Sequence, residues 1–152
     1  LYSDQVYPDA EAILAARAPA VAPWHTLALG MLAERQGELA FSSNKADRNE
    51  VDWMSYIAGP SLAILARHLD EARASGFVPY AEVAQRYLRE GEAAARYAAL
   101  TGWYAERRHF WVDNGPFYLH SVHPVERSVV LRRFADFPDR ADKWLRFDRP
   151  RI

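Results

Sequence analysis

Apolar residues at helical spacing dominate the chain between Pro8 and Arg108. They recur every three or four positions, as on one face of an α-helix, and glycine, proline and short polar runs interrupt them. Residues 45–50 are charged and are predicted to form a solvated loop or a short helix. The pattern predicts helices over 8–17, 26–41, 61–75 and 92–108, a short helix that begins near Pro79, and another short helix over 51–57.

The predicted helix over 61–75 has a clear end. Gly76 follows it, and a residue without a side chain readily adopts the left-handed conformation that terminates many helices. In the predicted helix over 92–108, Glu92 and Arg96 are four positions apart, so a favourable ion pair between them is expected.

The pattern changes after Arg108, where aromatic and β-branched residues replace the helical spacing. Strands are predicted over 109–112, 117–122 and 128–134, with a hairpin connection over 122–127 and a mostly irregular segment over 136–152. Helices followed by a small antiparallel β unit indicate an α+β fold. We expect one domain, 1–152, with its helical part over 8–108 and its β hairpin region and tail over 109–152.

Composition excludes several classes of function. The chain has 152 residues and a formal net charge of −1, so no strong field favours nucleic acid or an anionic membrane. It has no cysteine, which excludes disulfides, thiolate metal sites and a cysteine nucleophile. Arg17, Pro19 and Pro23 interrupt the longest apolar stretches, so no membrane span is predicted.

Histidines and carboxylates are the residues to inspect for catalysis or a metal. His120 and His123 lie near Glu126, but on a strand the two histidines are expected to face opposite sides. The other histidines lie in separate segments, without a Gly-x-Ser-x-Gly motif. No pair of carboxylates stands in an apolar context that would raise a pKa for acid–base work. The sequence therefore predicts no enzyme, no metal site and no cofactor.

The aromatic residues around the turn at 114–116 are the best candidates for binding a ligand. Aromatic walls and nearby polar groups can hold a peptide-type ligand. The alternative is that the aromatic residues form the hydrophobic core of the β unit, which is the commoner role of such side chains. The predicted ligand-binding residues are Trp111, Asp113, Asn114, Phe117 and Tyr118.

An ordered series of short motifs occupies the last third of the chain. The motifs cover 96–100, 103–104, 109–112, 114–119, 122–124, 130–134 and 137–139, with looser matches at 42–46 and 59–62. In this order they resemble the extracytoplasmic solute-binding proteins of the oligopeptide, dipeptide and nickel class (family 5), which serve ABC importers. The Gly115-Pro116 turn, followed by Phe117, Tyr118 and Leu119, is the most distinctive part of the resemblance.

The resemblance implies a periplasmic-binding-protein-like fold whose two lobes close on a small solute or peptide and deliver it to ABC permease subunits. It places the protein outside the cytoplasm, in the periplasm or at the cell surface of a bacterium or archaeon. Any membrane association would come through the transporter or an anchor outside this chain. Such receptors run to several hundred residues, so this chain is expected to be the C-terminal part of one. The alternative is a stand-alone helical domain that binds other proteins.

Overall fold

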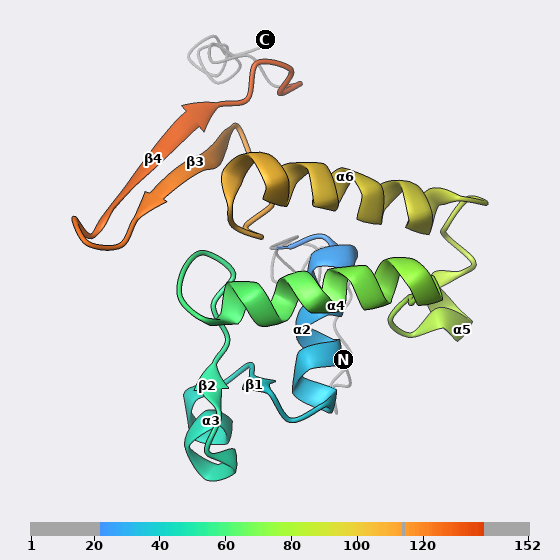
Figure 1. The fold of residues 1–152 in the computed structure, drawn as a ribbon. Coiled ribbons are helices and arrows are strands. Elements are labelled where there is room, and N and C mark those ends of the chain that lie inside the picture. Colours follow the sequence, from blue (N-terminus) through green and yellow to red (C-terminus); the bar gives the residue numbers. More distant parts are fainter. Residues whose placement is uncertain (1–21, 114, 139–152) are drawn as a thin grey trace, which may run out of the picture.

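Three helices form the body of the molecule (Figure 1). The structure is a computed structural model that describes residues 22–113 and 115–138. Helices α2 (Trp24–Arg35), α4 (Ser61–Ser75) and α6 (Glu92–Arg107) all contact one another. Between them lies the hydrophobic core, to which the three helices contribute Leu29, Leu32, Leu65, Leu69, Tyr97 and Leu100. The helix predicted over 8–17 and the tail beyond residue 138 lie outside the described residues.

Helices α4 and α6 confirm the sequence prediction closely. Helix α4 spans the predicted residues, and Gly76 follows it in the left-handed conformation, with a φ of 62°. Helix α6 ends one residue earlier than predicted, at Arg107, and the expected pair between Glu92 and Arg96 is present at 2.6 Å. Between these helices lies the short helix α5 (Ala81–Ala84), which begins two residues after Pro79.

The prediction over 26–41 is wrong at its C-terminal end. Helix α2 stops at Arg35, and Gly37 adopts a left-handed φ of 73°, which turns the chain away from the helix axis. The buried pair Leu39–Ala40 then forms strand β1 instead of a last helical turn. The charged segment that follows is a short helix, α3 (Ser43–Asn49), whose N-terminus is capped by the side chain of Ser42.

The helix predicted over 51–57 is absent. Asp52–Trp53 form strand β2, which pairs in parallel with β1 across the loop that α3 fills. The indole N–H of Trp53 donates to the carbonyl of Phe41 at 3.2 Å, which fastens the same two segments together. This pairing joins residues thirteen positions apart, as in Leu39 with Asp52, so local spacing did not reveal it.

Strands β3 (Phe117–His123) and β4 (Ser128–Arg133) form the predicted antiparallel hairpin, within one residue at each boundary. The register is interrupted between Leu119 and Ser121, where His120 is an additional residue opposite β4. The strand predicted over 109–112 does not form. The molecule is therefore α+β, with a small antiparallel sheet beside a helical body.

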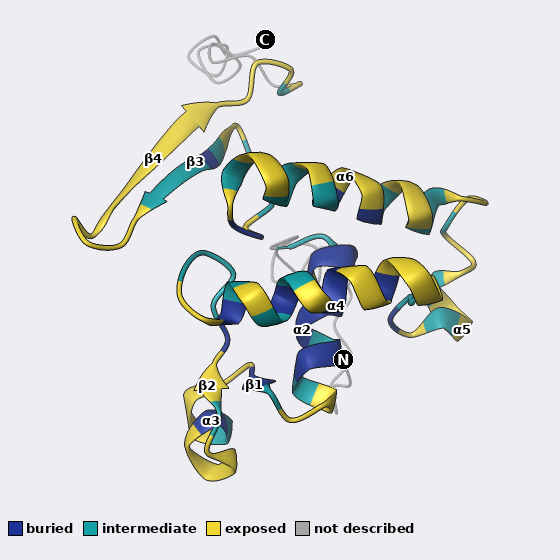
Figure 2. Ribbon diagram, viewed as in Figure 1, coloured by how far each residue is buried: buried dark blue, intermediate teal, exposed yellow. Residues whose placement is uncertain are grey.

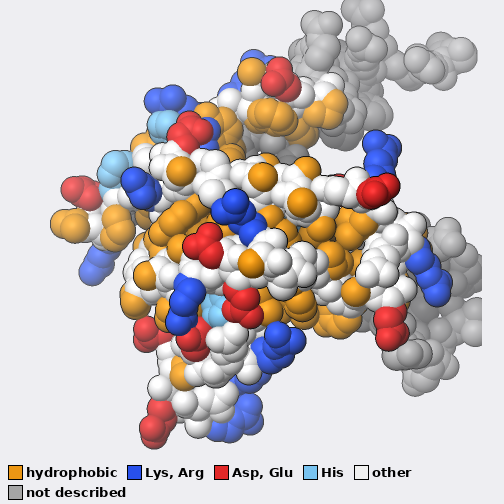
Figure 3. Space-filling model, turned by 45° about the vertical axis from the view of Figure 1, so that its right-hand side comes forward, with side chains coloured by type: hydrophobic (Ala, Val, Ile, Leu, Met, Phe, Trp, Pro, Cys, Tyr) orange, Lys and Arg blue, Asp and Glu red, His pale blue; other side chains and the backbone are white. Residues whose placement is uncertain are grey.

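The hairpin projects from the C-terminal end of α6 and is much more exposed than the helices. Figure 2 shows β4 exposed along its whole length, whereas buried positions concentrate on the inner sides of the helices. In Figure 3, hydrophobic side chains fill a band between α4 and α6, with charged side chains mainly around it. Among the described residues, no helix has both the length and the apolar character needed to cross a bilayer.

Candidate functional site

A cavity of about 300 Å³ lies beneath one face of the β3–β4 hairpin. This volume is at the lower end of the range for small-molecule sites. The hairpin and two loops of the helical body contribute its walls. The lining residues are Ile57, Trp111, Asp113, Phe117, Leu119 and Leu131.

Strand geometry explains why three hairpin residues share this cavity. Phe117 and Leu119 are two positions apart on β3, so their side chains point to the same face. Leu131 stands directly opposite Leu119 in the register of β4. These three side chains form a continuous apolar wall.

The opposite wall is held in place by a turn that follows α6. The backbone N–H of Phe110 donates to the carbonyl of Tyr56 at 2.7 Å, which brings the segment with Trp111 against the loop with Ile57. Phe110 is fully buried and stacks on the ring of Tyr104, with centroids 4.3 Å apart. The segment 109–112, which was predicted as a strand, is therefore a loop. Burial of Phe110 holds it in place without the hydrogen bonds of a β-sheet.

His109 joins the two walls of the cavity. Its Nε2–H donates to the carbonyl of Leu119 at 3.1 Å, and its Nδ1 accepts from the backbone N–H of Trp111 at 3.1 Å. These roles require the neutral imidazole with its proton on Nε2. Burial lowers the pKa of His109, and the nearby Arg107 and His120 add to this effect. Sequence reasoning missed His109 as a positioning residue; its only signal was its place two residues before Trp111.

The structure brings together three of the five predicted ligand-binding residues. Trp111, Asp113 and Phe117 line the cavity, and the two aromatic side chains are 44% and 56% exposed. Tyr118 lies on the other face of β3, away from the cavity. Asn114 lies outside the described residues.

Tyr118 instead belongs to a cluster that attaches the hairpin to α6. The guanidinium of Arg107 lies over the ring of Trp103 at 4.6 Å and over the ring of Tyr118 at 4.5 Å. Arg107 also donates to Nδ1 of His120 at 3.0 Å, and partial burial together with Arg132 and Arg107 lowers the pKa of His120. This side of the hairpin is thus occupied by packing within the chain.

The expectation that His120 and His123 face opposite sides is wrong. Ser121 and His123 stand opposite Val130 and Ser128, on the face of Tyr118, and the His120 ring also contacts Tyr118. The additional residue at His120 shifts the alternation of side chains. The two histidines still have separate partners, because His120 meets Arg107 and His123 lies 3.0 Å from the Ser121 hydroxyl. In the described part of the chain, no three His, Asp or Glu side chains are placed to hold a metal.

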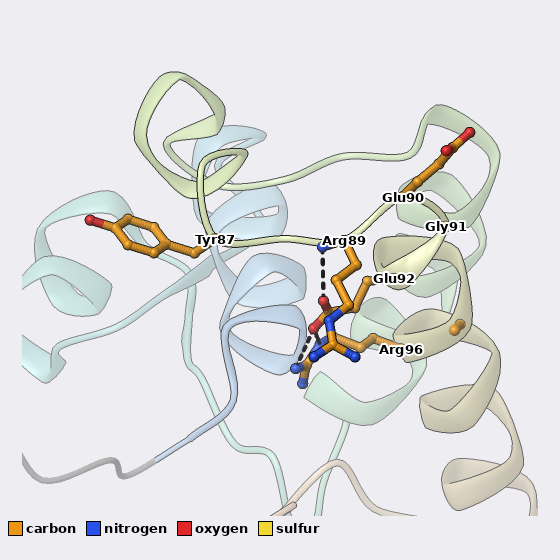
Figure 4. A pocket seen from close by; sticks show the side chains of 7 residues that line it. Tyr87, Arg89, Glu90, Gly91, Glu92 and Arg96 are labelled. Carbon is orange, nitrogen blue, oxygen red and sulfur yellow. Dashed lines mark hydrogen bonds and ion pairs between the residues drawn. The ribbon is translucent and has the colours of Figure 1, made fainter.

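A larger open hollow of about 700 Å³ lies at the start of α6, where the charges of Glu92 and Arg96 are paired with each other (Figure 4). The Glu92 carboxylate accepts from the backbone N–H of Arg89 at 3.0 Å and from Nε and Nη2 of Arg96 at 2.8 and 2.6 Å. These bonds, the backbone bond first, lower the pKa of Glu92. Tyr87 and Glu90 point away from this cluster in Figure 4. The hollow is therefore a weaker candidate than the hairpin cavity, because its central carboxylate already has three donors within the chain.

A third hollow, of about 370 Å³, lies between α2 and α5 and is almost wholly apolar. Binding sites for specific small molecules normally contain a few placed polar groups that orient the ligand. Little polar surface lines this hollow, so it offers no chemistry that would select a ligand. Its lining residues are Trp24, Leu27, Met31, Pro79, Tyr80, Val83, Ala84, Tyr87 and Leu88.

His68 forms a buried polar cluster that sequence reasoning did not identify. Its Nε2 lies 2.6 Å from Oε2 of Glu38, and its Nδ1 lies 3.0 Å from Oε2 of Glu71. Each ring nitrogen of His68 is therefore within hydrogen-bonding distance of a carboxylate oxygen. The cluster ties the segment before β1 to α4. Because the cluster joins two segments of the core, we assign it a structural role.

No family model, no curated protein and no solved structure matches the chain. The hairpin cavity is consequently characterised by its own chemistry. Five apolar side chains line the cavity together with one carboxylate, Asp113, which suits a ligand with an apolar group next to an N–H donor or a cation.

Proposed function

We propose that this chain is the C-terminal part of an extracytoplasmic receptor that captures a peptide or related solute for an ABC importer. The observation that carries the proposal is the hairpin cavity. Two motifs of the resemblance to solute-binding proteins meet there, since Trp111 belongs to the motif at 109–112 and Phe117 to the motif at 114–119.

The chemistry of the cavity fits a peptide-type ligand. Trp111 and Phe117 present large aromatic surfaces that would cover an apolar side chain. Asp113 would accept a hydrogen bond from a main-chain N–H or from an amino group of the ligand. Because the cavity lies beneath the hairpin and beside the loop of Ile57, it would form one side of a cleft. A second lobe of the receptor would complete that cleft, and lobe closure would signal occupancy to the permease.

Ligand-induced stabilisation of the full-length receptor tests the proposal. The receptor is heated with short peptides, oligosaccharides or nickel chelates, since a ligand that prefers the folded form raises the Tm. We expect a peptide to raise the Tm, and Trp111→Ala to abolish that shift. Tyr87→Ala is the matched control, because Tyr87 is an exposed aromatic residue away from the hairpin cavity. A shift that survives Trp111→Ala, or no shift with any compound, would contradict the proposal.

A second candidate function is a stand-alone domain that binds other proteins. Exposure of β4 favours it, because Val129, Val130 and Leu131 present apolar surface on a strand that is exposed throughout. A reading frame that starts within a few residues of Leu1 would support this candidate. An upstream extension of several hundred residues with an export signal would support the receptor.

A further inference from the structure

Strand β4 has one unpaired edge within the described residues. The sheet contains β3 and β4 alone in that part of the chain, and β3 lies between β4 and α6 (Figure 1). The backbone of an edge strand offers its N–H and C=O groups to any extended segment that approaches. We call this side of β4 the free edge.

Two hydrogen bonds determine which backbone groups of β4 point to the free edge. The N–H of Phe134 donates to the carbonyl of Pro116 at 2.8 Å, so the groups of Phe134 point toward β3. The carbonyl of Leu119 accepts from His109, so it points away from β4. Its partner Leu131 therefore occupies a non-hydrogen-bonded pair, in which both residues direct their backbone groups outward.

The backbone groups of successive residues in β4 point alternately toward β3 and toward the free edge. Val129 and Arg133 are two positions from Leu131 and likewise direct their N–H and C=O groups to the free edge. By contrast, His109 occupies the outer edge of β3 at Leu119, next to the C-terminal end of α6. The hairpin thus has one blocked edge and one available edge.

The side chains along β4 are apolar in the middle and basic at the C-terminal end. Val129 and Leu131 are 53% and 59% exposed. Arg132 and Arg133 follow them, and Arg127 precedes the strand. None of these three arginines forms an ion pair with another residue of the described part. A third strand along this edge would cover part of these exposed aliphatic side chains.

We propose that the free edge of β4 binds a separate polypeptide as an added antiparallel strand. Its aliphatic residues would lie beside Val129 and Leu131, and carboxylates near its amino end would pair with Arg132 and Arg133. Main-chain bonds would give affinity, and the arginines would select an acidic segment. The proposal uses the backbone edge of β4, which shares the Leu131 side chain with the cavity, and it does not depend on solute capture.

A second copy of this chain fits the free edge poorly. Strand β4 contains two arginines and no carboxylate, so a second copy paired through the same edge brings no opposite charge to Arg132 and Arg133 from its own strand. An acidic partner supplies that charge.

Fluorescence anisotropy with a labelled peptide tests the proposal on the intact chain. The probe is an octapeptide of alternating threonine and valine with two glutamates at its amino end, and a second probe carries lysines in their place. We expect the acidic probe to bind at least about tenfold more tightly than the lysine probe. Hydrogen exchange at the amides of Val129, Leu131 and Arg133 should slow when the acidic probe binds.

Two variants separate edge binding from general attraction. The double change Arg132→Glu and Arg133→Glu should weaken binding of the acidic probe by about tenfold or more. Arg48→Glu on α3 is the control and should leave the affinity for that probe unchanged. Leu131→Pro removes an outward donor and should abolish binding, while the edge position spares the ladder to β3. Equal binding of both probes, binding of neither, or protection in a dimer of the chain would overturn the proposal. The Trp111→Ala experiment is unaffected by any of these results.

Discussion

At the scale of single residues, Gly30 has the least room for a side chain of all the glycines in the described part of the chain. It lies within α2, and a Cβ atom there would stand closer than 3.0 Å to the Tyr56 hydroxyl, the Met54 sulfur and the Phe41 ring. Helical propensity favours alanine over glycine by about 1 kcal/mol, but a clash with three neighbours opposes this gain. A Cβ atom at this position would therefore force the ends of these three side chains to shift.

We expect Gly30→Ala to lower the free energy of unfolding by about 1–3 kcal/mol, as overpacking does in well-packed interiors. Gly102→Ala is the matched control, because a Cβ at that position in α6 has no neighbour within 4 Å. That change should stabilise the protein by about 0.5–1 kcal/mol through helix propensity. Urea unfolding measures the stability of both variants. A Gly30→Ala protein as stable as the parent would show that the loop with Tyr56 moves aside without a loss of stability.

At the scale of elements, the attachment of the hairpin to α6 depends on Arg107. Its planar guanidinium lies between Trp103 and Tyr118 and also reaches His120. A lysine would keep the charge but not the planar stacking or the fork of donors. The hairpin should therefore loosen even when the charge is conserved.

We expect Arg107→Lys to speed hydrogen exchange several-fold in β3 while the amides of α4 keep their protection, since local opening need not involve the whole fold. Exposed Arg86, beyond the end of α5, provides the control, and Arg86→Lys should change neither element. Uniform loss of protection in α4 and β3 would show instead that the hairpin and the helices open together.

How far the elements could be predicted depended on whether their determinants are local. Helices α4 and α6 and the hairpin carry their own boundaries, such as Gly76 and the turn at 124–127, and were predicted. The pairing of β1 with β2 has no local signature, because buried Leu39 finds its partner across α3. The cavity was likewise only partly predictable. Trp111 and Phe117 stood out in the sequence as aromatic residues. Ile57 reaches the cavity through a long-range hydrogen bond between Phe110 and Tyr56, which no local pattern reveals.

At the scale of the whole molecule, several titratable groups make the fold sensitive to acid. Burial, and secondarily the charge of Arg96, lowers the pKa of His25 from 6.5 to about 4. The unfolded chain therefore takes up a proton at His25 as the pH falls through 6.5, while the folded chain does not until about pH 4. His109 shifts in the same direction. Glu38 also contributes, because its hydrogen bond to His68, and then its bond to Arg67, lowers the pKa of its carboxyl group. As the pH falls through the ordinary carboxyl pKa, the unfolded chain takes up this proton before the folded chain does.

We expect the free energy of unfolding to fall by about 2 kcal/mol between roughly pH 7.5 and pH 5 through His25, and to fall further below the ordinary carboxyl pKa through Glu38. Urea titrations at several pH values measure this dependence. His25→Phe should flatten the upper part of the curve, whereas Glu38→Gln should flatten the lower part. Stability that stays constant from pH 7.5 to pH 5 would show that His25 titrates equally in both states.

The position of Trp111 gives the cavity an optical reporter of its own. The indole is nearly half exposed at the cavity wall, and His109 fixes its backbone. Any molecule that enters would displace water from one face of the ring, and the emission of that tryptophan would move toward the blue. Subtracting the spectrum of Trp111→Ala from that of the parent would isolate this one fluorophore, so filling of the cavity could be followed in real time without a label.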